Sequence, residues 1–468
     1  MRKIAASYIF PVSSPPIKFG IIYIDNNNKI IKIKDSNGNL TEEEGCELYN
    51  GAIIPGLVNA HTHLELSHLK EIYKSISGSA FKQQLGTPIN AKIKACNIDK
   101  SGTDAASESK VVLARTLPSR KEEGVKPICL RQMSILAMER NADFGIYGSS
   151  QTGMQAFLHS MINKPPFDRQ QIDLAISQAD SEMFLQGISV AGNICNSAHT
   201  LQTVKESKIR YTTFVELLGI NSSTATQATE RGNVIIEQFR KHQLPVSLTP
   251  HGPYSVSPVL LNKIAQSDYS RTISIHTLET PVESEQLTES EKSLRQFFIK
   301  NGILTDKKYY QRLHPYEYIL NNFTDRKVLL VHNTFAGKHD WEIALQTAQA
   351  NNLTLFAVTC PRSNITINSV TPDYRRWSDK IPICIGTDSL ASNSDLSVFE
   401  EIKFLLEHCN LPFQKVLTWA TLNGAKALDA DKTFGSLETG KSPGINLIED
   451  FDFKNMKPLK SSTIRRIV

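Results

Sequence analysis

Two histidines one residue apart, His61 and His63, follow a short apolar run at residues 53–58. Such a run is typical of a buried strand. Side chains alternate along a strand with period two, so the two imidazoles would project to the same side. Neutral imidazole is the most common metal ligand in proteins. Two polar residues at a strand end are common, however, so the pair by itself is only a hypothesis of a metal site.

The same pairing of an apolar run with a following polar residue recurs along the chain. Five of the twelve histidines fall just past strand-like apolar runs, as does one aspartate. Beyond the first pair, these residues are His251, His276, His332 and Asp388. A single histidine is more often a structural residue than a ligand, but recurrence at several strand ends favours a metal site.

Holding these residues together requires a particular arrangement of strands. Eight apolar strand candidates alternate with stretches that have helical apolar spacing, which predicts an α/β fold of the (β/α)8 TIM barrel type. The candidates are residues 53–58, 187–194, 210–217, 245–249, 272–275, 327–331, 354–358 and 381–385. In such a barrel, catalytic residues lie at the C-terminal ends of the strands. A doubly wound sheet would also alternate, but it relies on a glycine-rich phosphate turn that we do not find.

The two ends of the chain are predicted to build a second, smaller domain. Short β-rich runs broken by turn residues occur at both ends. We expect residues 1–55 and 436–468 to form a small β-sandwich, and residues 56–435 to form the barrel. Residues 73–150 are rich in Ser, Lys and Gly and contain no clear barrel unit. We interpret them as an insertion in the loop after the first strand.

The bulk composition is that of an ordinary globular protein. Hydrophobic residues make up 40% and charged residues 21% of the chain, which is typical of a folded domain. No apolar stretch is long enough for a transmembrane helix, and the N-terminus lacks a signal-like core, so we expect a cytoplasmic protein. The net charge of +5 comes without the basic clusters of a nucleic-acid-binding face. Seven cysteines without a Cys-x-x-Cys pair argue against a disulfide framework.

Several blocks of this sequence resemble the amidohydrolase superfamily, and more closely its deaminase and chlorohydrolase branch. That branch includes cytosine, guanine, S-adenosylhomocysteine and aminodeoxyfutalosine deaminases. The matching blocks are PGLVNAHTHLE at 55–65, the pair His276 and Glu279, Val331-His332-Asn333, CPRSN at 360–364, GTDS at 386–389 and GSLETGK at 435–441. The resemblance covers nearly the whole chain except about 73–150. It departs from the family pattern at Pro443-Gly444, where Ala-Asp is usual.

The resemblance implies a mononuclear metal site. Its ligands would be His61, His63, His276 and Asp388. Three imidazoles and one carboxylate suit Zn²⁺ first and Fe²⁺ second, and they leave a position for water. A metal ion of this kind can bring the pKa of bound water down to about 7, which supplies hydroxide at neutral pH.

The resemblance also implies three proton-transfer roles. Glu279 matches a proton-shuttling glutamate that protonates the substrate ring nitrogen and helps expel ammonia. His332 matches a histidine that accepts a proton from the water or steadies the tetrahedral intermediate. Asp388 would act as base as well as ligand. As isolated residues, Glu279 and Asp388 would be better explained by helix-entry roles.

Substrate contacts are predicted less firmly. His251 matches a substrate-contacting histidine of nucleoside-type deaminases, although it also suits a Gly-Pro turn. Glu65, Glu216 and Asn364 lie at or beyond strand ends and are weaker candidates.

The sequence therefore predicts a metal-dependent hydrolase that acts on carbon–nitrogen bonds other than peptide bonds. The reaction that the resemblance favours is hydrolytic deamination of an amino-substituted purine, pyrimidine or nucleoside-like heterocycle, a small molecule that reacts with water. Dechlorination uses the same ligands and stays open. Cyclic-amide hydrolysis generally needs a lysine at strand four, where residues 248–251 have none. The cytidine-deaminase signature is absent. An inactive metal-binding scaffold is a further alternative, and a homodimer is common in the family.

Overall fold

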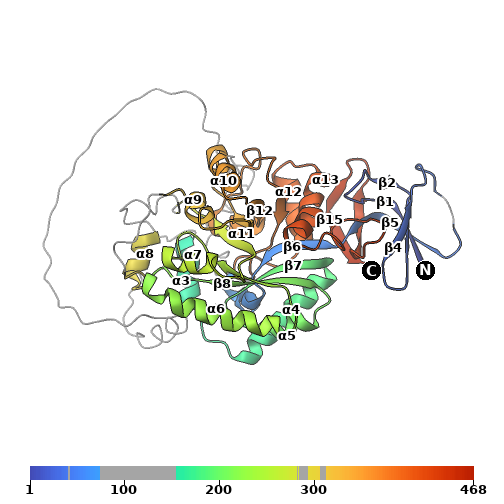
Figure 1. The fold of residues 1–468 in the computed structure, drawn as a ribbon. Helices are drawn as coiled ribbons and strands as arrows, with labels where there is room; N and C mark the ends of the chain where they lie inside the picture. The colour runs from blue at the N-terminus through green and yellow to red at the C-terminus, as the bar shows by residue number, and fades with distance from the viewer. Residues whose placement is uncertain (41–42, 74–153, 282, 284–293, 306–312) are drawn as a thin grey trace, which may run out of the picture.

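Both ends of the chain contribute strands to one seven-stranded sheet, and both termini lie at the same end of the molecule (Figure 1). The computed structural model describes residues 1–40, 43–73, 154–281, 283, 294–305 and 313–468. The sheet consists of β1 (Arg2–Ile9), β2 (Ile17–Lys18), β3 (Ile21–Ile24), β4 (Ile30–Lys34), β5 (Cys46–Pro55), β14 (Ile445–Asp452) and β15 (Lys457–Arg466). Its order is β15-β14-β5-β1-β3-β4, with β2 paired to β1.

Strand β5 joins the two ends of the chain within this sheet. It runs parallel to β1 and antiparallel to β14. Ile4, Ile22, Ile53 and Leu447 are buried together in its apolar core. The predicted association of the two chain ends is therefore present, while their arrangement as a sandwich stays a prediction.

Two four-stranded parallel sheets carry the strands predicted for the barrel. The first contains β6 (Leu57–Thr62), β7 (Ile188–Cys195), β8 (Arg210–Leu217) and β9 (Val246–Pro250). The second contains β10 (Thr272–Thr277), β11 (Lys327–His332), β12 (Thr354–Thr359) and β13 (Ile383–Ile385). Strands that follow one another in the chain are neighbours in each sheet, as expected for repeated β–α units.

The predicted first strand at residues 53–58 is wrong in its bounds. Strand β5 ends at Pro55 and β6 begins at Leu57, so Gly56 separates the two sheets. A Cβ at Gly56 would collide with the Ser189 hydroxyl and the Pro443 carbonyl, so the close approach requires glycine. The sequence does not reveal this break, because the residues on both sides of it are buried and the apolar pattern continues across it.

Hydrogen bonds connect the outer strands of the two parallel sheets on both sides. Between β9 and β10, the Ser274 N–H donates to Thr249 Oγ1 (2.9 Å), and Thr249 Oγ1 donates to the Ser274 carbonyl (2.6 Å). Between the chain after β13 and β6, the Thr387 N–H donates to the His61 carbonyl (3.0 Å). The eight strands therefore form a continuous set of neighbours.

Helices alternate with these strands along the chain. In Figure 1, α4, α5 and α6 lie on one side of the strands, and α10, α12 and α13 lie on the other. The α-helices are α3 (Met154–Ile162), α4 (Arg169–Leu185), α5 (Leu201–Glu206), α6 (Ala225–Arg240), α7 (Pro258–Ala265), α8 (Leu294–Lys300), α9 (Pro315–Leu320), α10 (Lys338–Ala350), α11 (Pro361–Asn368), α12 (Val398–His408), α13 (Phe413–Thr418) and α14 (Gly424–Ala427). Helical segments of the 3₁₀ type are η1 (Leu64–Leu69) and η3 (Ser222–Thr224), and η5 (Trp419–Asn423) is a π-helical segment.

Helix α4 shows how the local sequence sets a helix start and a buried face. The Asp168 carboxylate accepts from the Gln171 N–H (2.8 Å), and Gln171 Oε1 accepts from the Asp168 N–H (3.1 Å). This reciprocal pair satisfies amides that the first turn leaves free. Ile176, Ala179 and Met183 then follow at spacings of three and four and are buried.

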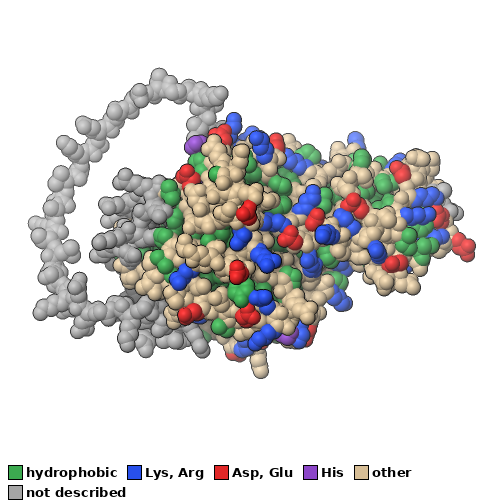
Figure 2. All heavy atoms as spheres, in the orientation of Figure 1, with side chains coloured by type: hydrophobic (Ala, Val, Ile, Leu, Met, Phe, Trp, Pro, Cys, Tyr) green, Lys and Arg blue, Asp and Glu red, His purple; other side chains and the backbone are tan. Residues whose placement is uncertain are grey.

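The predicted insertion and the expected lack of a membrane-spanning helix are compared with the described residues. Residues 74–153, nearly all of the predicted insertion at 73–150, lie outside the described residues. Within the part of the chain that is described, we find no helix with both the length and the apolar character needed to cross a membrane. On the face drawn in Figure 2, acidic and basic side chains are interspersed.

Candidate active site and metal centre

Predicted ligands from both parallel sheets converge at the C-terminal ends of their strands. One nitrogen or oxygen atom each of His61, His276, His332 and Asp388 lies within 4.8 Å of the others, and all four side chains are buried. His63 Nε2 lies 3.5 Å from Asp388 Oδ1 and 3.3 Å from His276 Nε2. The structure therefore brings together the whole predicted ligand set, with His332 beside it.

The chemistry of this cluster fits a divalent cation. His61 Nε2 is buried without a hydrogen-bond partner among the described residues. The Nε2 atoms of His63 and His276 face each other at 3.3 Å. Two imidazole lone pairs at that distance repel unless a proton or a cation lies between them. A convergent set of imidazole nitrogens with one carboxylate is the donor set that Zn²⁺ prefers.

The electrostatics of the cluster favour the ligand forms of its members. Burial lowers the pKa of His61, His63 and His276, and neighbouring imidazoles add to the effect, so the rings are neutral at pH 7. Burial opposes ionisation of Asp388, but the nearby imidazoles, His63 foremost, still hold the pKa of this carboxyl below its usual value. Neutral rings and an ionised carboxylate are the states that bind metal.

The Nδ1 atoms of three histidines in the cluster contact side-chain or backbone oxygens. His61 Nδ1 lies 3.4 Å from Ser274 Oγ. His276 Nδ1 lies 2.8 Å from the His251 carbonyl oxygen, which can only accept. The proton of His276 is therefore on Nδ1, and the lone pair is on Nε2, which faces the cluster. His332 Nδ1 lies 2.9 Å from Asn364 Oδ1. Asn364, predicted as a substrate contact, is fully buried against His332.

Asp388 is held by two serines that the sequence analysis did not assign. Ser363 Oγ and Ser392 Oγ both donate to Asp388 Oδ2, at 2.7 Å and 2.5 Å. Oδ1 is then left toward His61 (3.8 Å) and His63 (3.5 Å). Asp388 has a φ of +60°, a left-handed conformation that a short polar residue tolerates. Ser392 follows Asp388 by four residues, a spacing that could have suggested a contact.

Glu279 is buried beside the cluster, on the loop that follows β10. Its Oε1 lies 3.6 Å from His332 Nε2. Burial raises the pKa of Glu279 well above its ordinary value, and the charge of Asp388 adds to this. A carboxyl that keeps its proton at neutral pH can act as a general acid. The position of Glu279 is therefore compatible with the proton-transfer role predicted for it.

Two other predicted substrate contacts differ in their surroundings. His251 lies close to the cluster, and Glu65 is hydrogen-bonded to the loop after β7. The centroid of the His251 ring is 4.6 Å from that of His276, and its Nδ1 lies 2.6 Å from Ser255 Oγ. The two Glu65 oxygens accept from the Asn196 N–H and from Ser197 Oγ, both at 2.8 Å. Both oxygens of Glu65 therefore bind the loop after β7.

Glu216, a weaker candidate from the sequence, lies directly beside the cluster. Its Oε1 is 3.5 Å from His276 Nδ1 and is buried without a hydrogen-bond partner among the described residues. Burial raises the pKa of Glu216 to about 8. His63, Glu216 and His276 form a second group that could hold a metal ion. The only sequence signal for this residue was its place near the end of a predicted strand.

A buried carboxyl behind the Asp388 loop leads to a prediction about stability. Glu401, on α12, accepts from the Arg362 N–H (3.0 Å) and from Asn393 Nδ2 (2.8 Å). Asn393 Nδ2 also donates to the Thr387 carbonyl next to Asp388 (2.9 Å). Burial raises the pKa of Glu401 to about 7, although Arg362 lowers it in part.

We expect Glu401→Gln to reduce the loss of stability that the wild type shows as pH rises from 5 to 8. The folded protein binds this proton more tightly than the unfolded chain, so the contribution is complete below about pH 4.5 and is lost as pH rises through 7. Each unit of pKa difference corresponds to about 1.4 kcal/mol. Thermal unfolding at several pH values measures the effect. Glu407→Gln, an exposed position on the same helix, is the control. A difference in Tm between the wild type and E401Q that is the same at pH 5 and pH 8 would contradict this assignment.

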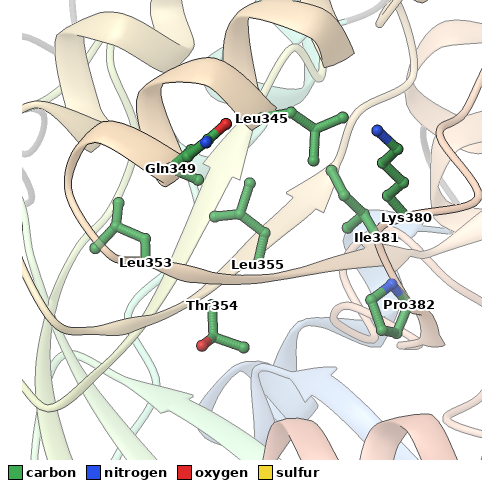
Figure 3. A pocket seen from close by; sticks show the side chains of 9 residues that line it. Leu345, Gln349, Leu353, Thr354, Leu355, Lys380, Ile381 and Pro382 are labelled. Carbon is green, nitrogen blue, oxygen red and sulfur yellow. The ribbon is translucent and has the colours of Figure 1, made fainter.

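The pocket drawn in Figure 3 is separate from the cluster. It has a volume of about 410 Å³ and is lined by α10 and by Thr354, the first residue of β12. Strand β12 leads from there toward the end where the cluster lies, so the pocket is at the opposite end of the strand. Its wall is mainly apolar, with Leu345 and Leu355 among its residues and Lys380 beside them. None of the predicted site residues lines it.

Comparison with known proteins places this fold and cluster in a family. The model of the amidohydrolase family matches residues 52–464. The adenosine deaminase of Helicobacter pylori is 28% identical over 313 residues, which cover 64% of this chain and 73% of that protein. The aminodeoxyfutalosine deaminase of Nitratiruptor sp. is 26% identical over 287 residues, covering 58% and 67%.

Solved structures agree on the fold. The structure of Helicobacter pylori aminofutalosine deaminase superposes with a TM-score of 0.65 at 21% identity and covers 97% of this chain and 94% of that one. An adenosine deaminase from Xanthomonas campestris with bound zinc gives a TM-score of 0.57 at 17% identity, with 98% and 86% covered. Because the family model matches nearly the whole chain, this protein belongs to the amidohydrolase family and is a hydrolase.

Proposed function

We propose that this amidohydrolase hydrolytically deaminates an amino-substituted purine, in particular an adenine nucleoside or a derivative of one. The observation that carries the proposal is the buried Glu279 carboxyl, which lies 3.6 Å from His332 and beside a convergent set of metal ligands. The names of the similar proteins, adenosine deaminase and aminodeoxyfutalosine deaminase, support a nucleoside-like substrate.

The metal ligands in this proposal are His61, His63, His276 and Asp388. When bound there, a divalent cation, Zn²⁺ first and Fe²⁺ second, would activate water for attack on the amine-bearing carbon. The zinc-bound structural relative supports this choice of ion. His276 is held in the ligand tautomer by the His251 carbonyl, and Asp388 is aimed by Ser363 and Ser392.

Proton transfer is assigned to side chains that lie beside the proposed metal ligands. Glu279, protonated because it is buried, would donate its proton to the ring nitrogen next to the amine-bearing carbon. Asp388 and His332 would accept a proton from the attacking water. A proton returned to the amine nitrogen then allows the carbon–nitrogen bond to break. One water is consumed, and one ammonia and one ring carbonyl are formed.

We also infer a closed (β/α)8 barrel as the scaffold for this chemistry. The hydrogen bonds between β9 and β10, and between the residues after β13 and β6, support closure because they join both outer edges of the two parallel sheets. Closure would bring the C-terminal ends of all eight strands around one site. Residues that are distant in the sequence, such as His61 and Asp388, would then act as one unit.

The proposed function predicts ammonia release from adenine nucleosides. The zinc-loaded protein should deaminate at least one of adenosine, 5′-deoxyadenosine, 5′-methylthioadenosine, S-adenosylhomocysteine or aminodeoxyfutalosine, with kcat/KM on the order of 10⁴ M⁻¹s⁻¹ or more. Ammonia should be released one-to-one with the loss of the adenine absorbance. Cytosine and a chloropurine riboside serve as controls for other reactions of the superfamily. Chloride release without deamination of any amine would contradict the proposal.

A further inference from the structure

One buried carboxylate, Glu283, binds the backbone of the loop that carries Glu279. Its Oε2 accepts from the Leu278 N–H (2.7 Å). Its Oε1 accepts from the N–H groups of Glu279 (2.7 Å) and Thr280 (3.2 Å). Three consecutive amides are thus bound by a single side chain that is only 2% exposed.

The loop held in this way is otherwise irregular. Leu278 has a φ of +44°, a left-handed conformation that a branched apolar residue rarely adopts. Its N–H and that of Glu279 therefore point in directions that a regular strand or helix would not satisfy. On the other side, Asn368 Nδ2 donates to the Glu279 carbonyl (2.9 Å). Glu283 and Asn368 together fix the peptide groups on both sides of the Glu279 Cα.

The placement of Glu283 is unfavourable for stability alone. Burial raises the pKa of Glu283 to about 7, in spite of the three N–H groups that favour its ionised form. Two buried carboxyls close together oppose each other's ionisation. The three amides that Glu283 binds explain a carboxyl at this position by the geometry of the loop rather than by a gain in folding stability.

We propose that Glu283 is a positioning residue for the deamination, fixing the Glu279 backbone so that the Glu279 carboxyl stays within reach of both the substrate ring nitrogen and His332. This inference rests on the proposed function. Misplacing a proton donor by about 1 Å can lower a rate about 100-fold. Glu283 itself does not touch the reacting atoms, so its loss should affect the chemical step more than substrate binding.

Glu283→Gln tests this role because glutamine keeps the shape but only one acceptor oxygen. Its NH₂ group would face a backbone N–H, leaving at least one of the three amides unbound. We expect kcat to fall 10- to 100-fold, KM to change less than threefold and the bound zinc to remain at the wild-type level. Hydrogen exchange of the peptide containing residues 278–280 should become at least tenfold faster. Steady-state kinetics, metal analysis and exchange mass spectrometry measure these quantities.

Two variants serve as controls. Glu317→Gln removes a comparable carboxylate, one that accepts from the His314 N–H at the start of α9, and should change neither kcat nor exchange at residues 278–280. Glu279→Gln should lose turnover without faster exchange, which separates a lost proton donor from a loosened loop. Glu283→Asp keeps both acceptor oxygens on a shorter side chain and should recover part of the kcat lost in E283Q.

The outcomes separate this inference from the proposed function. If the wild type deaminates a substrate and E283Q keeps its kcat, or raises only KM, the positioning role is wrong while the function stands. If the wild type deaminates nothing, the function fails, and the exchange data still decide whether Glu283 holds the loop. If E283Q does not fold, hydrogen exchange of the amides of residues 278–280 in the wild type decides whether Glu283 holds the loop. Fast exchange of the three amides there would overturn the inference.

Discussion

Replacing Glu279 by glutamine is expected to lower kcat for deamination by at least 10³-fold while the bound metal stays at the wild-type level. Glutamine has the same shape as glutamate but no transferable acidic proton, and general acid–base catalysis contributes about 10²- to 10⁴-fold. Glu279 is buried and its pKa is raised, which favours the protonated form that a general acid needs. It is not part of the predicted ligand set, so metal binding should not change.

The measurement combines kcat and KM on the best substrate with metal analysis and thermal unfolding of the same preparation. An unchanged melting temperature would show that loss of activity is not loss of fold. The isosteric change also removes an unfavourable buried acid, so a small gain in stability is acceptable. Near-normal turnover by E279Q with full metal content would mean that another group supplies the proton, and the assigned mechanism would be wrong.

Replacing His61 by alanine is expected to remove both the metal and the activity. His61 Nε2 is buried and lacks a hydrogen-bond partner among the described residues, so its role as a ligand is the available explanation for its position. Losing a partner outside the ligand set weakens metal binding about 10- to 100-fold in comparable sites, and losing a ligand should weaken it more. Turnover should fall with metal occupancy, at least 10³-fold at limiting zinc.

Metal content after equilibration with a zinc buffer measures this effect directly and does not depend on knowing the substrate. The matched control is His339→Ala, because the side chain of His339 is 84% exposed on α10 and lies outside the cluster. The control should retain wild-type metal. If the His61 variant binds one equivalent of zinc as tightly as the control does, the ligand assignment is refuted.

Much of the fold followed from local patterns. The apolar runs that form β7 to β13 could be recognised in the sequence, because a parallel strand that is buried on both faces is a continuous apolar segment. The exception was the first run, where the pattern continued across Gly56 and hid the change from β5 to β6. The break depends on the close approach of Ser189 and Pro443 to Gly56, and both residues are far from Gly56 in the sequence.

In the candidate site, too, some residues could be predicted from the sequence and others could not. Each proposed ligand residue follows an apolar run, and the resemblance to the family motifs implied the grouping that the structure brings together. The residues that orient them were not found. Glu283 has no distinctive local pattern, the four-residue spacing from Asp388 is the one local signal for Ser392, and Glu216 differed little from other carboxylates at strand ends. The contact between Asn364 Oδ1 and His332 Nδ1 was not predicted, and the substrate contact proposed for Asn364 stays a prediction.

The sequence by itself determined which residues could bind a metal, which strands carry them and which family the chain resembles, because these depend on residue type and on periodicity over short segments. Only the tertiary structure decided how those residues meet. His61 and Asp388 are adjacent because the chain after β13 bonds to β6, and Glu279 is held by Glu283 through three backbone amides. Hydrogen-bond partners and burial depend on sheet register and on contacts between distant segments, which no local pattern encodes.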